Sequence, residues 1–251
     1  MRFGGTPRLG AWVKLPAPES VELLAVAGFD FVVIDNEHGA IDVRTVSTMI
    51  ALARGCGIDA FVRVAGTAPR DVQIPLDAGA RGLFVPQIDD AADAHAAVAS
   101  TRFPPLGRRG ASNSGRAGRW GLDALVDYVA AGNDDTVLVV QAESVGALES
   151  IVDIGCLPGV DAVFVGPADL AVSSRRTHTD TELAALLDAA ERRCLEHGVP
   201  LGTTASRDAP ELLARGYHFL VLGSDTGFLR STGAALVTAA RGPTTTGSHR
   251  G

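Results

Sequence analysis

Short apolar runs alternate along the chain with longer segments whose apolar residues recur at helical spacing. Residues 20–28 show the second pattern and end on a glycine suited to a helix C-cap. Eight runs have the length and composition of buried parallel strands: Leu9–Leu15, Asp30–Asp35, Ala60–Val64, Gly82–Pro86, Thr136–Gln141, Asp161–Gly166, Pro200–Thr204 and Phe219–Gly223. Eight alternating strand and helix units predict an α/β fold, a single (β/α)8 TIM barrel, rather than an open sheet.

The pattern predicts one domain followed by a short tail. The chain has 251 residues, close to the roughly 250 of a typical barrel, so we expect the barrel to cover residues 1–241. Residues 242–251 are predicted to form a disordered tail. The longest connection runs from Phe103 to Trp120, after the fourth strand, and is rich in Gly, Pro, Arg and Ser. A loop of this length in a compact domain is usually functional or disordered.

Composition excludes several classes of protein. No apolar run approaches the roughly 18 residues of a membrane span, and the N-terminus lacks the apolar stretch of a signal peptide. The formal net charge of −7 argues against a nucleic-acid partner. Cys56, Cys156 and Cys194 are too widely spaced for a metal-ligand pattern and odd in number for a disulfide framework. These features predict a cytoplasmic protein with neither a membrane nor a nucleic-acid partner.

Two carboxylates follow successive predicted strands. Glu143 comes directly after the apolar run 137–142, and Asp169 follows the run 160–166. A helix-like segment, Ser144 to Ile154, lies between them. In a β-α-β unit, the two side chains would stand side by side at the carboxyl edge of the sheet, where barrel enzymes place their chemistry. Two hard oxygen ligands beside open coordination positions suit Mg²⁺ or Mn²⁺.

Three further residues are candidates for catalysis. His38 follows the second strand on the same predicted edge, which favours function over the structural role that a lone histidine more often has. Arg63 ends the third strand, and its planar fork of donors suits a substrate carboxylate, although a structural acid is an equal alternative. Asp77 lies late in the following helix, where the alternative is a solvated position.

Weaker signals come from a turn and from a lysine. The small residues of Gly166-Pro167-Ala168 would let backbone N–H groups approach a ligand, or would simply form a strand-to-helix turn. Lys14 is the only lysine in the chain, so any Schiff-base chemistry has one candidate residue. It lies at the end of the first strand, beside Pro16, where it could face the barrel mouth, although a lysine on the rim is the more common case.

The chain resembles the HpcH/HpaI aldolases, the metal-dependent class II pyruvate aldolases that act on 2-oxo acids. The resemblance runs from about Leu9 to about Leu229. It is carried by a series of motifs in order: Gly10-Ala11-Trp12, Asp35-Asn36-Glu37-His38-Gly39, Arg63-Val64, Leu76-Asp77-Ala78-Gly79-Ala80, Val85-Pro86, the stretch 102–110, Arg119-Trp120-Gly121, Gln141-Ala142-Glu143 and the stretch 165–170. The resemblance implies a barrel of the phosphoenolpyruvate/pyruvate type and reversible aldol cleavage of a 4-hydroxy-2-oxo acid to pyruvate and an aldehyde.

The resemblance also implies roles for individual residues. Glu143 and Asp169 would ligate a divalent metal (Mg²⁺, Mn²⁺ or Co²⁺). Arg63 would bind the pyruvate unit and stabilise enolate charge, and His38, paired with Asp77, would move protons through a water.

Other implied roles concern the walls of the pocket and the assembly. Gln141 would contact the pyruvyl group, and the backbone of Pro167 and Ala168 would hold its carboxylate. Trp12 and the Arg108–Trp120 loop would border the pocket. Family members are commonly homo-oligomers, namely hexamers that exchange their last helix, with sites near subunit interfaces.

Departures from the family pattern affect the second substrate. The usual Ser-Leu-Gly turn after the second ligand is replaced by Ala171–Thr177, which contains Arg175 and Arg176. One of these guanidinium groups could hold a carboxylate or phosphate on the aldehyde, or both could point into water. Lys14 also stands where a small or polar residue is more usual.

Three alternative functions remain open from the sequence. The first is oxaloacetate decarboxylation at the same site, with the resulting enolate protonated or captured by a second substrate. The second is a non-catalytic barrel that binds a 2-oxo acid, which would require a missing ligand or base. The third is a lysine-dependent aldolase, which would rest on Lys14 alone.

Overall fold

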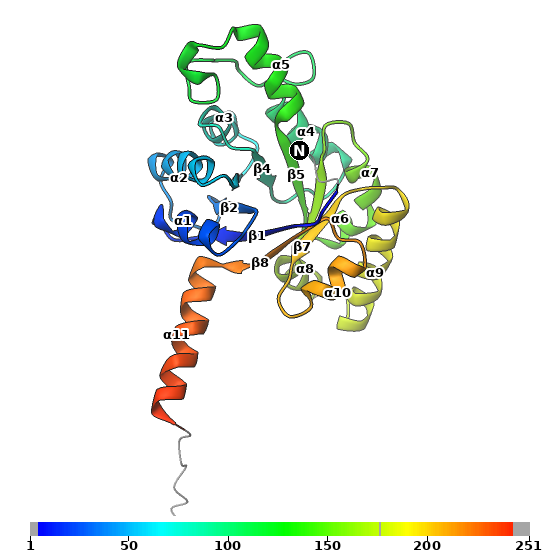
Figure 1. Ribbon diagram of the computed structural model, residues 1–251. Helices are drawn as coiled ribbons and strands as arrows, with labels where there is room; N and C mark the ends of the chain where they lie inside the picture. The colour runs from blue at the N-terminus through cyan, green and yellow to red at the C-terminus, as the bar shows by residue number, and fades with distance from the viewer. Residues whose placement is uncertain (1–4, 176, 243–251) are drawn as a thin grey trace, which may run out of the picture.

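Eight parallel strands close into a single barrel in the computed structural model, which describes residues 5–175 and 177–242 (Figure 1). Each strand pairs with the next along the chain, and the last pairs with the first. The strands are β1 Arg8–Val13, β2 Phe31–Asp35, β3 Asp59–Arg63, β4 Gly82–Val85, β5 Val137–Ala142, β6 Ala162–Val165, β7 Leu201–Thr204 and β8 Phe219–Ser224. The predicted (β/α)8 TIM barrel is therefore confirmed.

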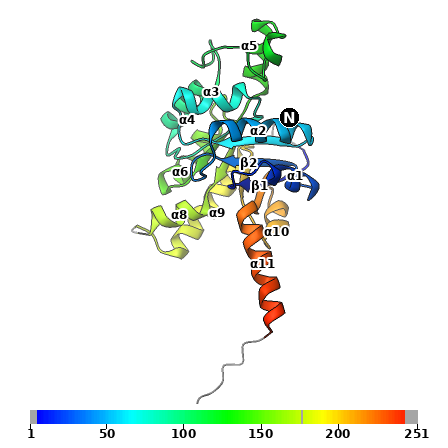
Figure 2. The ribbon, with the colours of Figure 1, turned by 90° about the vertical axis from the view of Figure 1, so that its left-hand side faces the viewer.

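Helices surround this barrel on its outer face (Figures 1 and 2). They are α1 Glu19–Val26, α2 Val43–Gly55, α3 Pro69–Asp77, α4 Ala91–Thr101, the 3-10 turn η1 Arg119–Gly121, α5 Leu125–Asp135, α6 Val145–Glu149, α7 Ile151–Gly155, α8 Pro167–Ser174, α9 Asp180–Glu196, α10 Ala209–Ala214 and α11 Asp225–Arg241. The segment expected to form one helix over 144–154 forms two short ones, because Ser150 leaves helical geometry (φ −95°, ψ 7°).

The interior of the barrel is packed with apolar side chains. Alternate residues of a strand point to opposite faces, so every second position enters the barrel. The inward positions form one cluster: Trp12, Phe31, Val33, Phe61, Phe84, Val137, Val139, Ala162, Phe164, Phe219 and Val221. A Cβ added at Gly10 would lie 2.2 Å from the Phe31 ring, so glycine makes room for this ring. A filled interior confines chemistry to the mouth of the barrel.

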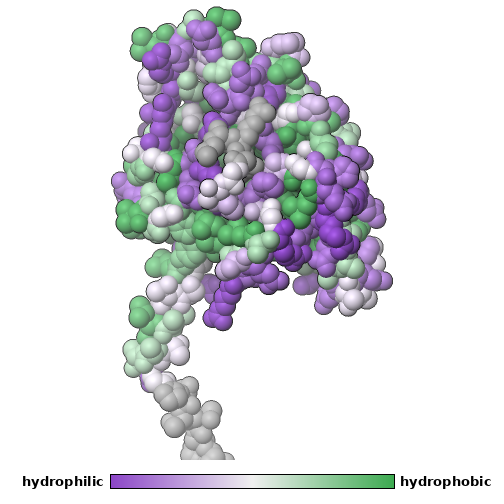
Figure 3. Space-filling model, turned by 45° about the vertical axis from the view of Figure 1, so that its right-hand side comes forward, coloured by the Kyte–Doolittle hydropathy of each residue, from purple (hydrophilic) through white to green (hydrophobic). Residues whose placement is uncertain are grey.

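The last helix, α11, leaves the barrel and extends away from it (Figures 1 and 2). No residue of α11 is buried, and Leu229 (71% exposed) and Leu236 (67%) are exposed on it. Hydrophobic surface is visible along the helix (Figure 3). Within residues 5–175 and 177–242, no helix has both the length and the hydropathy needed to cross a membrane. Most of the predicted tail, residues 243–251, lies outside the described residues.

Candidate active site

The side chains that point into the barrel change from apolar to polar at the carboxyl end of several strands. In β2 the inward series is Phe31, Val33 and Asp35, and in β3 Phe61 is followed by Arg63. In β5, Val137 and Val139 are followed by Gln141 and then, just past the strand, by Glu143: these side chains share the same face of their strand. The strand alternation therefore delivers a ring of polar groups to one end of the barrel.

Asp35 and Arg63 form a fully buried ion pair in this ring. They are register partners on β2 and β3, and Arg63 donates from Nε to Oδ1 (3.0 Å) and from Nη2 to Oδ2 (2.7 Å). The backbone N–H groups of Glu37 and His38 also donate to Oδ1. Burial opposes the charged form, but the hydrogen bonds and charge of Arg63 outweigh it and hold the pKa of Asp35 far below its usual range.

The guanidinium of Arg63 is fixed on further sides. Its Cζ lies 4.5 Å from the centroid of the Trp12 ring, a distance suited to a cation–π contact. Its Nη1 lies 3.3 Å from Oε2 of Glu37. Since Nε and Nη2 are occupied by Asp35, Nη1 is the edge that a substrate oxygen can approach most readily.

Glu143 lies across the mouth and is held by two donors. Gln141 Nε2 donates to its Oε1 (2.6 Å), and the backbone N–H of Gln87 donates to its Oε2 (3.3 Å). Burial raises the pKa of Glu143 to about 7; the Gln87 hydrogen bond opposes this rise, and the charges of Asp169 and Glu37 add to it. Neighbouring carboxylates together create a negative potential, which attracts a cation.

Asp169 is the third residue of α8, one strand further around the barrel. Pro167, Ala168 and Asp169 form the first turn of that helix and are exposed, so its N–H groups can meet an anion. Two buried acceptors in the same region, Glu37 Oε2 and Gln141 Oε1, have no hydrogen-bond partner among the described residues.

The oxygen atoms of this site suit a divalent metal. Glu143 and Asp169 offer hard carboxylate oxygens, which suit Mg²⁺, Mn²⁺ and similar cations, and the unpartnered Gln141 Oε1 can accept from a water bound there. No group of three or more His, Cys, Asp or Glu side chains arranged to hold a metal occurs within residues 5–175 and 177–242. A site with two carboxylates leaves coordination positions for substrate and water.

His38 and Asp77 contact different residues. The His38 side chain is 58% exposed, and its Nε2 is 3.7 Å from Glu37 Oε2. Asp77 ends α3, and its Oδ1 accepts from Arg109 Nη2 (2.6 Å) and from the Tyr128 hydroxyl (2.8 Å). The predicted pairing of His38 with Asp77 is not among the contacts within the described part of this chain.

Lys14 lies at the mouth of the barrel, beside Asp35, although a position on the rim was the more common case for a lysine. Its Nζ lies 2.9 Å from Asp35 Oδ2, and its side chain is 35% exposed. A Schiff base would require this amine to leave Asp35. The signal was present in the sequence, because Lys14 is two residues beyond Trp12 and so continues the inward phase of β1.

Gln87 was also missed by the sequence analysis. It adopts a left-handed conformation (φ 58°) after β4, which points its N–H at Glu143. A non-glycine residue in this region of backbone space is often found near functional sites. Of the two arginines proposed for the second substrate, Arg175 is exposed after α8, and Arg176 lies outside the described residues.

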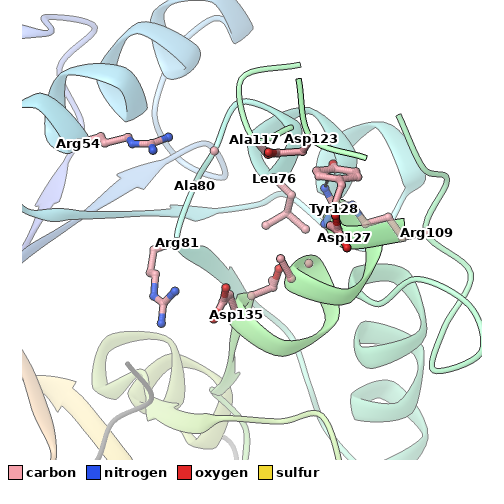
Figure 4. A pocket seen from close by; sticks show the side chains of 14 residues that line it. Arg54, Leu76, Ala80, Arg81, Arg109, Ala117, Asp123, Asp127, Tyr128 and Asp135 are labelled. Carbon is pink, nitrogen blue, oxygen red and sulfur yellow. Dashed lines mark hydrogen bonds between the residues drawn. The ribbon is translucent and has the colours of Figure 1, made fainter. Parts of the chain in front are cut away.

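A cavity of about 480 Å³ lies at the opposite, amino-terminal end of the barrel, between α3 and α5 (Figure 4). Arg81 and Thr136, which precede β4 and β5, line it, together with Arg54 and several acidic residues. It contains none of the polar groups at the mouth. The candidate active site is therefore the mouth, where the strand ends converge.

The chain is similar to a known family of enzymes. Residues 8–232 match the model of the family described as HpcH/HpaI aldolase/citrate lyase. The 5-keto-4-deoxy-D-glucarate aldolase of Shigella dysenteriae serotype 1 (strain Sd197) is 36% identical over 230 residues, which cover 89% of this chain and 88% of the relative.

Solved structures share the fold. An HpcH/HpaI aldolase/citrate lyase family protein from Burkholderia cenocepacia J2315 has a TM-score of 0.87 and 32% identity, covering 96% of this chain and 97% of that one. The citrate synthase SbnG has a TM-score of 0.81 and 29% identity, covering 94% of each chain.

Proposed function

The chain belongs to the HpcH/HpaI aldolase/citrate lyase family, and we propose that it cleaves a 4-hydroxy-2-oxo acid reversibly to pyruvate and an aldehyde, using a divalent metal. Membership confirms the family and the lyase class predicted from the sequence, that of the class II pyruvate aldolases. The proposal is carried by one observation: the Asp35-bound guanidinium of Arg63 and the carboxylate of Glu143 occupy the same mouth.

We assign the binding of the 2-oxo acid to three groups. The Nη1 edge of Arg63, which Asp35 leaves open and which lies 3.3 Å from Glu37 Oε2, would bind the substrate carboxylate or its carbonyl oxygen, and Trp12 keeps the guanidinium plane fixed. The Gln141 amide contacts the pyruvyl group while it orients Glu143. The first turn of α8, at Pro167 and Ala168, offers backbone dipoles to the carboxylate.

Charge develops on the 2-oxo acid as the bond between C3 and C4 breaks. A metal held by Glu143 and Asp169 would supply Lewis acidity to the 2-oxo acid. Arg63 stabilises negative charge on the same fragment, because its cation is already oriented before reaction. His38, exposed at the mouth, exchanges a proton with the 4-hydroxyl through a water.

Decarboxylation of oxaloacetate is a second candidate at the same site. The fixed guanidinium of Arg63 supports it, because it could hold a carboxylate of oxaloacetate, whereas the likeness to the citrate synthase SbnG bears only on carbon–carbon bond formation. The same Arg63 and metal ligands would stabilise the enolate left by loss of carbon dioxide. Turnover of oxaloacetate without an aldehyde would separate this reaction from aldol cleavage.

We further propose a cytoplasmic homo-oligomer, specifically a hexamer. Support comes from α11, whose apolar residues are exposed on a helix that leaves its own barrel. Exposed hydrophobic patches of this kind mark interfaces. The partly exposed Asp77 and the exposed His38 would then pair between two subunits.

The proposal is tested with full-length protein stripped of metal by a chelator. Pyruvate in D₂O should exchange its methyl protons only after Mg²⁺, Mn²⁺ or Co²⁺ is restored. Pyruvate is then offered with neutral and acidic aldehydes, and 5-keto-4-deoxy-D-glucarate is offered for cleavage. A stronger preference for acidic aldehydes that Arg175→Ala abolishes would assign Arg175 to the second substrate. Absence of metal-dependent exchange would refute the proposed function.

A further inference from the structure

Lys14 enters the mouth from the strand that carries Trp12. Its backbone is fixed there, because Asp225 accepts hydrogen bonds from the N–H of Lys14 (3.0 Å, Oδ1) and of Leu15 (3.1 Å, Oδ2). Asp225 is the first residue of α11, so the last helix of the chain holds the turn that follows the first strand. These hydrogen bonds fix the backbone at Lys14, and the contact with Asp35 places its ammonium.

The Lys14 ammonium completes the coordination of Asp35. Oδ2 of Asp35 receives both Lys14 Nζ (2.9 Å) and Arg63 Nη2 (2.7 Å). Oδ1 receives Arg63 Nε and two backbone N–H groups, so the carboxylate has five donors for about four lone-pair sites. A saturated carboxylate at full burial cannot rotate without breaking several hydrogen bonds, which locks the plane of Arg63.

Lys14 also changes the charge around Arg63. Arg63 lies between two carboxylates, Asp35 and Glu37, whose formal charges together exceed its own. The ammonium of Lys14 brings the formal charge of these four side chains to zero. It neutralises part of the Asp35 charge, so that less of this charge offsets the positive charge of Arg63. Charges in a partly buried site are screened less than at the surface, so this effect reaches an anion at Nη1.

We propose that Lys14 is a positioning residue for Arg63: through the shared oxygen of Asp35 it fixes the guanidinium and keeps it electropositive toward the carboxylate of a 2-oxo acid. This inference rests on the proposed function, in which Arg63 binds that carboxylate. Lys14 acts through Asp35 and Arg63, and it forms no covalent bond to substrate.

The test compares Lys14→Met, which keeps the length but removes the charge, with Lys14→Arg, which keeps the charge. Binding of Mn²⁺ alone, and of pyruvate to the Mn²⁺-loaded protein, is measured by calorimetry. Lys14→Met should weaken pyruvate binding by about 3- to 10-fold and leave Mn²⁺ binding unchanged or tighter, because a cation has been removed near carboxylates. Lys14→Arg should bind pyruvate nearly as the parent does.

Matched controls separate this role from a structural one. Arg54→Met removes a positive charge at the amino-terminal end of the barrel, so it should alter neither affinity. Unchanged pyruvate binding in Lys14→Met, equal weakening of pyruvate and Mn²⁺ binding, or a Lys14→Arg variant as weak as Lys14→Met would each overturn the proposal. A parent protein that binds pyruvate but catalyses neither exchange nor cleavage would refute the proposed function alone.

The single lysine allows a second, direct readout. Reductive methylation with ¹³C-formaldehyde keeps the ammonium charge and labels only Lys14 and the α-amino group. The Lys14 signal, identified by its absence from Lys14→Arg, should shift when pyruvate is added to the Mg²⁺-loaded protein. A signal that stays in place under saturating pyruvate would overturn the coupling of Lys14 to the substrate site.

Discussion

Gly166 lies directly against the side chain of Glu143. A Cβ added at Gly166 would come 2.8 Å from Glu143 Cγ and 3.0 Å from its Oε1, both closer than ordinary packing allows. Gly166 follows β6 and precedes α8, which carries Asp169, and Glu143 follows the neighbouring strand β5. The Glu143 side chain therefore occupies space between the ends of these two strands. The absence of a side chain at 166, three residues before Asp169, leaves the space that the Glu143 side chain occupies.

The first prediction concerns this close approach. Gly166→Ala should displace Glu143 and weaken Mn²⁺ binding by roughly the 10–100-fold seen when residues that orient metal ligands are changed. Gly55→Ala is the control, because a Cβ there meets nothing within 4 Å. Calorimetry with Mn²⁺ measures both. Parent-like affinity in Gly166→Ala would show that Glu143 either moves freely or is not a ligand.

The second prediction concerns the two carboxylates themselves. Glu143→Gln and Asp169→Asn each remove a negative charge while nearly keeping shape, so both should lose at least 10–100-fold in metal affinity and exchange no pyruvate protons at low metal concentration. Asp153→Asn, on α7, removes a charge elsewhere and should leave the affinity unchanged. Full activity of the parent in excess chelator would contradict the prediction.

The third prediction separates Arg63 from His38. Arg63→Ala should raise KM for pyruvate and lower kcat, because its cation serves both the bound substrate and the enolate-like transition state. His38→Ala should mainly lower kcat of aldol cleavage, by roughly the 10²–10⁴-fold of a general acid–base group. Steady-state kinetics and methyl-proton exchange in D₂O measure both. If neither variant differs from the parent, the assigned roles are wrong.

The fourth prediction concerns acid stability. Burial lowers the pKa of His218 from its ordinary value of 6.5, and its Nδ1 accepts from the N–H of Leu201 (3.3 Å). Between the lowered pKa and 6.5 the unfolded chain binds more protons, so the free energy of unfolding should fall as pH falls through this window. His218→Asn should reduce this slope in urea titrations, whereas His95→Asn, at an exposed position of α4, should not. Equal slopes in all three proteins would remove His218 as the cause.

The fifth prediction concerns α11. Replacing Leu229 and Leu236 by Ser should shift the protein to a smaller species in light scattering, because both side chains are exposed on a helix that has no buried residue within its own chain. Leu122→Ser, at an exposed site outside α11, is the control. A parent protein that is monomeric and active at assay concentration would exclude the proposed assembly.

Much of the site follows from periodicity alone. Inward positions alternate along each strand, and Arg63 and Glu143 stand at or just beyond strand ends, so their meeting at the mouth could be inferred from chain position. The same rule places Asp35 and Lys14 in this ring, although a position on the rim is the more common case for a lysine. The alternation of inward positions along the strands was therefore the better guide to Lys14 than the usual position of a lysine on the rim.

Contacts that depend on loops could not be obtained in this way. Asp77 pairs with Arg109 and Tyr128 because the connection after β4 and the start of α5 return to the end of α3, and no local pattern encodes that return. Gln87 reaches Glu143 only through a left-handed backbone conformation, which glutamine rarely adopts without tertiary support.

The sequence by itself determined the barrel, the order of its strands and the residues that end them, because side-chain alternation and strand–helix order are local properties of the chain. Only the tertiary structure decided which polar groups share a hydrogen bond. The sharing of Asp35 Oδ2 by Lys14 and Arg63 depends on the register of three strands and on the hydrogen bond that Asp225 accepts from the backbone N–H of Lys14. Such distances between remote segments are set by packing of the whole barrel, and a pattern along one segment contains no information about them.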